Sequence, residues 1–349
     1  MSNYFKINNL NCFFGKHTIL ENITFSIKKK GDIVCFLGPS GVGKTTLLRS
    51  IAGLEKNISG EIKLNNKLIS SNSFNLDPEY RNIALSFQEN CLFPNKNILE
   101  NINLGIKKSH AKKININNLI SDFYLSGMLD KYPHEISTGE AQRVSLIRSL
   151  ATEPELLLLD EPFANIDQSL KEELKIKLKT FLKKNLISTI VVTHDSEEAF
   201  YFSDLCGVIL DKRIEQIDTP YNIHHNPVSE KVATFLNRGN LINAFVVGPN
   251  KINHKVLGLI EGNFSKKHKI GKKVKLLIQP EDLTHDDKSK LKLKIIDVKF
   301  RGANFDYTLE LNEKEKINVQ VHSHHTHRHK ITEYFGVKLP IFIDHLVCF

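Results

Sequence analysis

The feature that most constrains this chain is a glycine-rich stretch, residues 38–46, with the pattern G-x-x-x-x-G-K-[ST] of a phosphate-binding loop. An apolar run at 33–37 comes directly before it and predicts a buried strand, and the stretch at 46–52 directly after it predicts a helix. In that context the glycines let backbone N–H groups surround phosphate oxygens, and the helix N-terminus adds its dipole. We expect Lys44 to reach the outer phosphates and the Thr45 hydroxyl to ligate Mg²⁺. All the loop residues are candidate nucleotide contacts: Gly38, Pro39, Ser40, Gly41, Val42, Gly43, Lys44, Thr45 and Thr46.

Length and charge set broad limits. A chain of 349 residues predicts two domains. No apolar run approaches the roughly 18 residues needed to cross a membrane, and the first ten residues lack a signal-peptide pattern. The five cysteines have no paired spacing, which predicts reduced thiols in a cytosolic protein. Of the net charge of +9, a net +7 lies in 241–349. This positive charge could attract nucleic acid or an anionic membrane face. The lysines are dispersed, however, which favours an ordinary solvated surface.

Polar groups follow two further apolar runs. Four leucines at 156–159 predict a strand buried on both faces, as in a parallel sheet, and Asp160 and Glu161 stand at its end. Ligands of α/β sheets bind at this end of the strands. We therefore expect Asp160 to hold Mg²⁺ through water and Glu161 to polarise a water against the γ-phosphate; the alternative is a simple helix N-cap. The β-branched run at 188–193 predicts another strand, which ends in His194 at the same edge.

Three other segments supply candidates. Residues 98–152 are predicted to be largely helical, and the stretch 136–143 opens the last of these helices. The strand predicted at 81–87 ends in Gln88. Phe14 lies in an alternating segment that predicts antiparallel strands, and its ring is either part of the core or a platform for an adenine base.

The C-terminal part, 241–349, changes character. Turn residues separate short β-type runs, the signature of a small β-barrel or sandwich. These runs are 241–247, 274–278, 291–300, 305–311, 317–321 and 341–349. A histidine cluster at 322–329 either binds a transition metal or forms a polar loop, the latter favoured because no carboxylate or cysteine joins it.

Taken in order, these motifs resemble the nucleotide-binding subunit of an ABC transporter. The resemblance rests on 38–46, Gln88, 137–143, 160–161 and His194. It covers essentially the whole first domain, expected at 1–240, and implies an α/β P-loop NTPase (ABC ATPase) fold with a helical subdomain at about 98–152. It implies an ATPase that uses ATP and Mg²⁺.

The second domain, expected at 241–349, resembles the OB-like (TOBE-type) regulatory domain of importer ATPases. The match rests on Gln279-Pro280-Glu281-Asp282 and on the joint at 234–241. The resemblance therefore implies a small all-β domain after the ATPase domain.

The resemblance also assigns catalytic and metal-binding roles. Glu161 is implied as the catalytic base and His194 as the switch histidine that touches the γ-phosphate. Gln88 starts the loop that senses Mg²⁺ and contacts the membrane subunit. Thr45, Gln88 and Asp160 are the implied metal-binding residues.

Further nucleotide contacts follow from the same family. Phe14 matches the aromatic residue that stacks on adenine, and Asp167 belongs to the D-loop. Ser137, Gly139 and Glu140 belong to the signature motif, which in this family binds the ATP held by the P-loop of the other copy. One P-loop per chain therefore implies a homodimer.

The signature motif departs from the family pattern at Thr138, where a glycine is usual. A negative φ would accommodate threonine, whereas a positive φ would strain the backbone by roughly 1–3 kcal/mol. Since Ser137, Gly139, Glu161 and His194 are all present, we expect Thr138 to be tolerated.

The implied partners are two integral-membrane permease subunits and an extracytoplasmic solute-binding protein, with this chain peripheral on the cytoplasmic face of the inner membrane. Residues 305–309 and 323–325 most resemble the ferric-iron group, while polyamine, sulfate and other solutes remain open. Two functions compete with import: that of a nucleic-acid-linked ABC ATPase, which would carry insertions or coiled coils, and that of a binding module without turnover. We expect no nucleic acid partner.

Overall fold

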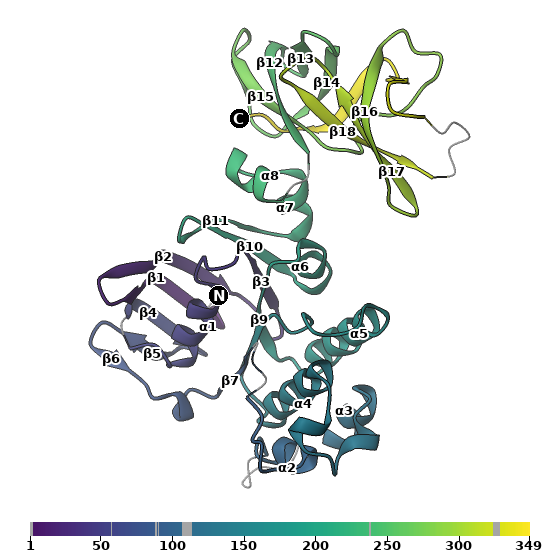
Figure 1. Ribbon diagram of the computed structural model, residues 1–349. Helices are drawn as coiled ribbons and strands as arrows, with labels where there is room; N and C mark the ends of the chain where they lie inside the picture. Colours follow the sequence, from purple (N-terminus) through teal and green to yellow (C-terminus); the bar gives the residue numbers. More distant parts are fainter. Residues whose placement is uncertain are drawn as a thin grey trace. The chain divides into compact units, whose positions relative to one another are not determined.

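The computed structural model shown in Figure 1 describes residues 3–56, 58–87, 89, 91–106, 114–236, 239–323 and 329–349. Backbone contacts divide the chain into two compact units, 1–220 and 221–349. This division lies upstream of residue 240, where the sequence predicted the boundary between the two domains. Two short helices, α7 (Pro220–His225) and α8 (Glu230–Leu236), therefore group mainly with the second unit.

The first unit contains a six-stranded sheet in the order β11-β10-β3-β9-β8-β7. Its strands are β3 (Ile33–Leu37), β7 (Ile83–Ser86), β8 (Leu156–Asp160), β9 (Ser188–Thr193), β10 (Leu205–Leu210) and β11 (Arg213–Asp218). All neighbours are parallel except the β10–β11 pair. Every residue of β3, β8 and β9 is buried, as expected for central strands covered on both faces.

A second, antiparallel sheet has the order β2-β1-β4-β5-β6. Its strands are β1 (Phe5–Phe14), β2 (His17–Ile27), β4 (Ile58–Leu64), β5 (Lys67–Ser71) and β6 (Phe74–Asn75). Helix α1 (Lys44–Ala52) lies between the two sheets (Figure 1), and its residues Leu47, Leu48 and Ile51 share one buried cluster with side chains from both. This packing fixes the helix that carries the phosphate-binding loop.

The remaining helices of the first unit are α2 (Ile98–Asn103), α3 (Ile116–Asp122), α4 (Thr138–Ala151), α5 (Gln168–Lys184) and α6 (Ser196–Phe202). Of three short 3₁₀ turns, η1 (Pro78–Tyr80) precedes β7, and η2 (Ser126–Met128) and η3 (Pro133–Glu135) lie between α3 and α4. Helices α2, α3 and α4 group together (Figure 1) and correspond to the helical subdomain expected at about 98–152.

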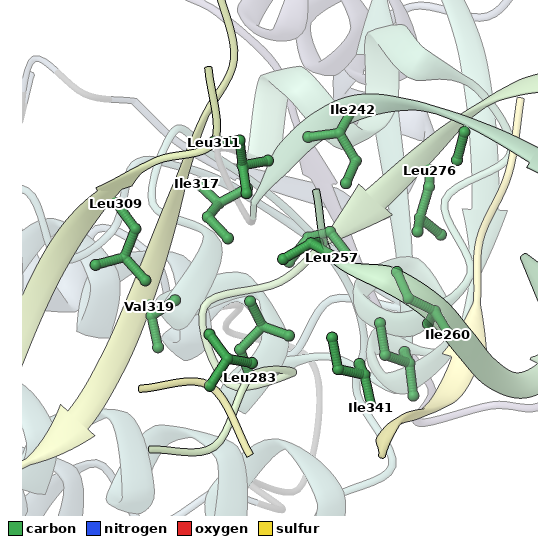
Figure 2. Close-up of a cluster of buried hydrophobic side chains, with 14 of the residues drawn as sticks. Ile242, Leu257, Ile260, Leu276, Leu283, Leu309, Leu311, Ile317, Val319 and Ile341 are labelled. Atoms are coloured by element: carbon green, nitrogen blue, oxygen red, sulfur yellow. The ribbon is translucent and has the colours of Figure 1, made fainter. Parts of the chain in front are cut away.

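The second unit has two sheets, with strand orders β15-β12-β13-β14-β20 and β18-β17-β16-β19. The strands are β12 (Asn240–Gly248), β13 (Lys251–His254), β14 (Gly258–Phe264), β15 (Lys273–Ile278), β16 (Lys292–Phe300), β17 (Asn304–Glu310), β18 (Lys316–His322), β19 (Tyr334–Gly336) and β20 (Ile341–Leu346). Aliphatic side chains from both sheets form one core (Figure 2), which includes Ile242, Leu276, Leu309 and Ile317. The all-β expectation for this part is confirmed.

Among the described residues, no helix combines the length and the apolar character required to span a bilayer.

Candidate functional site

Three strand ends meet at one edge of the parallel sheet. In the register, Leu37 at the end of β3 is paired with Thr193 at the end of β9, and Asp160 at the end of β8 is paired with Val192. The phosphate-binding loop directly follows β3 and His194 directly follows β9, while Asp160 ends β8 and Glu161 is the next residue. The sheet thus brings together groups that are about 150 residues apart in the chain.

The loop between β3 and α1 has the backbone of a phosphate-binding site. Gly41 and Gly43 have φ values of 79° and 107°, in the left-handed region that favours glycine. A Cβ on Gly43 would also lie 2.9 Å from the Leu20 side chain. Helix α1 begins at Lys44 without a side-chain N-cap or an acidic residue in its first turn, so its N-terminal N–H groups can face an anion.

Lys44 is buried and held by its own loop. Its Nζ donates hydrogen bonds to the carbonyl oxygens of Gly38, at 2.7 Å, and Pro39, at 3.1 Å. Burial lowers the pKa of Lys44, while the nearby carboxylates of Glu161 and Asp160 oppose that shift. The ammonium is thus positioned between the loop and the two acidic residues.

Asp160, the last residue of β8, interacts with side chains of the phosphate-binding loop. Its side chain is only 4% exposed. Burial raises the pKa of Asp160; a hydrogen bond to the Thr45 side chain and the charge of Lys44 lower it, and the charge of Glu161 raises it further. A desolvated carboxylate and a hydroxyl in contact are oxygen ligands of the kind that Mg²⁺ prefers.

Glu161 and His194 form the second pair at this edge. Oε1 of Glu161 lies 2.9 Å from Nδ1 of His194, and the Glu161 side chain is 15% exposed, against 60% for His194. The backbone of Glu161 has a φ of 47°, and its N–H donates to the carbonyl oxygen of Val192 at 2.9 Å. This turn directs a partly desolvated carboxylate toward the strand edge and leaves the imidazole accessible to a ligand.

The signature motif caps helix α4. The Ser137 hydroxyl accepts from the Glu140 N–H at 3.2 Å, and the Glu140 carboxylate accepts from the Ser137 N–H at 2.7 Å and from its hydroxyl at 2.9 Å. This is a capping box. The bond from the Ser137 backbone is the main reason that the pKa of Glu140 is lowered, although partial burial opposes it.

Thr138 is the first residue of α4 and is not among the described residues with positive φ. Thr138 therefore does not adopt the strained backbone conformation that a positive φ would impose. A β-branched residue is compatible with the first position of a helix.

Gln142 and Gly139 hold helix α4 close to the turn that follows β8. The Gln142 amide N–H donates to the carbonyl oxygen of Glu161 at 2.8 Å, and its amide oxygen accepts from the Asn165 N–H at 3.3 Å. A Cβ on Gly139 would lie 2.5 Å from the carbonyl oxygen of Asn165. Glycine is needed at 139 for close approach rather than for its dihedral freedom. Sequence reasoning did not single out Gln142, whose only signal is a polar residue within a buried helix face.

The other candidates are less closely connected. The Phe14 side chain is 79% exposed, as a stacking platform requires. Asp167 lies at the start of α5, where its carbonyl oxygen accepts from the Leu170 and Lys171 N–H groups. Gln88 lies outside the described residues, and so do three histidines of the cluster, His324, His325 and His327.

The family model described as "ABC transporter" matches residues 20–164, and the model described as "TOBE domain" matches 276–340. The chain is 37% identical over 248 residues to the Fe(3+) ions import ATP-binding protein FbpC 2 of Haemophilus influenzae, covering 70% of this chain and 69% of that protein. It is 40% identical over 245 residues to the spermidine/putrescine import ATP-binding protein PotA of Thermotoga maritima, covering 69% and 65%.

Among solved structures, the chain is similar to a dimeric structure of the ATP-binding cassette MJ0796 in a post-hydrolysis state, bound to ADP and Pi. The TM-score is 0.55 at 27% identity, and the match covers 62% of this chain and 98% of that one. The α/β cassette fold is thereby confirmed.

The contact at Gly139 generates a stability prediction. Gly139→Ala should destabilise the first unit by roughly 1–3 kcal/mol, because the added methyl group meets a backbone oxygen that cannot move cheaply. The melting temperature should fall by about 2–4 °C per kcal/mol in a unit of this size. The matched control is Gly127→Ala, where nothing lies within 4 Å of the added Cβ. Thermal unfolding by calorimetry checks the prediction, and equal melting temperatures for the two variants would contradict it.

Proposed function

Because this chain belongs to the ABC transporter family, as an ATP-hydrolysing subunit of the importer type, we propose that two copies of it drive the uptake of a solute through separate membrane subunits. Ferric iron is the first candidate for that solute. The observation that carries this proposal is the junction of three parallel strand ends. There the phosphate-binding loop, Asp160, Glu161 and His194 lie side by side.

Glu161 is proposed as the general base. Its carboxylate lies beside the loop that holds the phosphates and is partly removed from water, which suits a group that orients and polarises an attacking water molecule. His194 holds the carboxylate through the 2.9 Å hydrogen bond and presents its exposed ring to the γ-phosphate. Lys44 supplies positive charge from the loop side, where negative charge develops on the transferred phosphoryl group.

Mg²⁺ is the proposed metal cofactor. Thr45 and Asp160 would hold it, since both side chains offer oxygen ligands and the Thr45 hydroxyl lowers the pKa of Asp160 as a hydrogen-bonding partner. When bound, the ion neutralises charge on the phosphate oxygens. Gln88 remains a proposed third contributor on the basis of the family resemblance.

The homodimer is proposed because the signature motif is available to a second copy. Ser137 and Thr138 lie at the N-terminus of a fourteen-residue helix, whose N–H groups and dipole favour an anion. Ser137, Gly139 and Glu140 would face the nucleotide on the P-loop of the partner copy, with Asp167 nearby. Phe14 would stack on the adenine of its own copy's nucleotide.

A pocket beside β7 is the proposed docking surface for a permease subunit. Phe93 and Leu104 line it and are about half exposed, an apolar surface of the kind that marks protein contacts. Arg148 shapes the pocket by donating to the carbonyl oxygen of Cys91 at 2.9 Å. In the sequence, β7 is followed closely by Gln88, the proposed start of the loop that senses Mg²⁺ and contacts the permease. Such docking would place the chain peripherally on the cytoplasmic face of the membrane, with an extracytoplasmic solute-binding protein on the opposite side.

Ferric iron is preferred as the solute because one relative imports Fe(3+) ions at 37% identity and the match covers 69% of its length. A polyamine remains the second candidate, supported by the spermidine/putrescine relative at 40% identity over a similar span. Sulfate is the third. The intact Glu161–His194 pair and the unstrained Thr138 favour an active ATPase over a module without turnover.

The first test concerns the base. Glu161→Gln should retain ATP binding and lose most turnover, because the amide keeps the size of the side chain and removes its basicity. The ATP-bound variant should elute as a dimer from a sizing column. Phosphate release and nucleotide binding measure the two halves of this prediction, and hydrolysis at the parental rate would remove Glu161 from this role.

Thr138→Gly tests the signature motif. We expect kcat for ATP hydrolysis in the presence of the membrane subunits to change less than about tenfold, a barrier change under roughly 1.4 kcal/mol, because the native residue is not strained. A parental protein without measurable turnover that the glycine variant rescues would show instead that threonine disables the site.

The solute is tested by growth. Deleting the gene should impair growth on ferric iron as the sole iron source and leave growth on polyamine or sulfate unaffected. A plasmid carrying the parental gene should restore growth, and one carrying the Glu161→Gln variant should not. Impaired growth on polyamine or sulfate alone would refute iron and leave the ATPase assignment standing.

A further inference from the structure

Two segments of the second unit that are distant in sequence meet around a pair of histidines. His285 lies in the connection between β15 and β16, and it forms an isolated antiparallel bridge with Val337. The Asp286 N–H donates to the carbonyl oxygen of Gly336 at 2.9 Å, and a Cβ on Gly336 would lie only 2.0 Å from the carbonyl oxygen of Asp286. This close backbone junction fixes His285 and Asp287 next to His329.

The three side chains direct one atom each toward a common point. Nε2 of His329 lies 3.0 Å from Nε2 of His285, which lies 3.2 Å from Oδ1 of Asp287; the third separation, His329 Nε2 to Asp287 Oδ1, is 3.9 Å. The point equidistant from these atoms in their plane is about 2.0 Å from each, the length of a bond from zinc to imidazole or carboxylate. Two ring nitrogens this close repel each other when both carry protons.

We propose that His285, Asp287 and His329 form a binding site for a divalent transition-metal ion in the C-terminal domain, with Zn²⁺ as the reference ion. Two imidazole nitrogens and one carboxylate oxygen are ligands for zinc and for ferrous iron, and three ligands leave a coordination position open to water. Magnesium and calcium prefer all-oxygen sites and are not expected to compete.

The surroundings resemble those of a built metal site. The side chains of His285 and His329 are 3% and 13% exposed, whereas Asp287 is half exposed and gives access from solvent. The His285 ring packs edge-on against Phe335, with 4.6 Å between ring centroids, and the Tyr307 ring lies edge-on to His329. Nδ1 of His329 lies 3.8 Å from the Glu333 carboxylate, which can orient the ring from behind as outer carboxylates do in metal sites.

Metal binding can be measured without ATP hydrolysis, so the test uses metal binding by the full chain. Purified protein stripped with a chelator should bind one Zn²⁺ per chain in a calorimetric titration, with no effect of excess Mg²⁺. Asp287→Asn and His329→Gln should each weaken binding at least tenfold, because each replaces a carboxylate or imidazole ligand of zinc with a weakly binding amide. Co²⁺ in place of Zn²⁺ should give visible absorption bands in the parental protein that both variants lose.

His322→Ala is the matched control, since His322 is an exposed histidine of the same unit outside the three-residue site. It should leave the affinity and the cobalt spectrum unchanged. Circular dichroism and ATP binding by the first unit should be the same in all variants, which excludes misfolding. Equal zinc affinity in the parental, Asp287→Asn and His329→Gln proteins would overturn the proposal. A loss in His322→Ala as large as that in His329→Gln would also overturn it, because the exposed histidines would then hold the ion.

Discussion

The register between β3, β9 and β8 is the constraint on which the nucleotide site depends. Each of these strands is buried along its whole length, so its position relative to its neighbours is fixed by packing on both faces as well as by the backbone ladder. A shift of one residue between β8 and β9 would move Asp160 and Glu161 away from His194 and the P-loop. The chemistry at the edge therefore depends on aliphatic residues that never contact a ligand.

This part of the fold could be predicted because buried strands and phosphate-binding loops have strong local patterns. The run at 33–37 predicted β3 to the residue, and the run at 188–193 predicted β9. The helical subdomain was harder. Within the stretch 98–152, which was predicted to be largely helical, helix α3 ends at Asp122 and the chain turns through Tyr124 with a φ of 58°. The buried Arg143 donates to the carbonyl oxygen of Phe123 at 2.8 Å, a contact across 20 residues that helical periodicity cannot reveal.

The other features that the sequence did not predict depend on contacts between segments that are distant in the chain. Strand β14 pairs in parallel with β20, and a Cβ on Gly262 would lie 1.8 Å from the carbonyl oxygen of Ile343. The sequence indicated neither β14 nor the meeting of His285 with His329, since both depend on the folding of the second unit. The histidine cluster at 322–329 could be recognised in the sequence. The carboxylate that completes the proposed metal site could not, because Asp287 lies in another segment of the chain.

The hydrogen bonds of Lys44 have a consequence for how the site meets its ligand. A lysine side chain has on the order of 2 kcal/mol of rotamer entropy, and this freedom is normally lost when the ammonium is immobilised on a phosphate. Here the carbonyl oxygens of Gly38 and Pro39 already restrict the side chain when the protein folds. The loss of side-chain entropy therefore occurs when the protein folds and not when the nucleotide binds. An arriving nucleotide meets a prearranged cation whose donors exchange carbonyl partners for phosphate oxygens, which favours rapid and reversible capture.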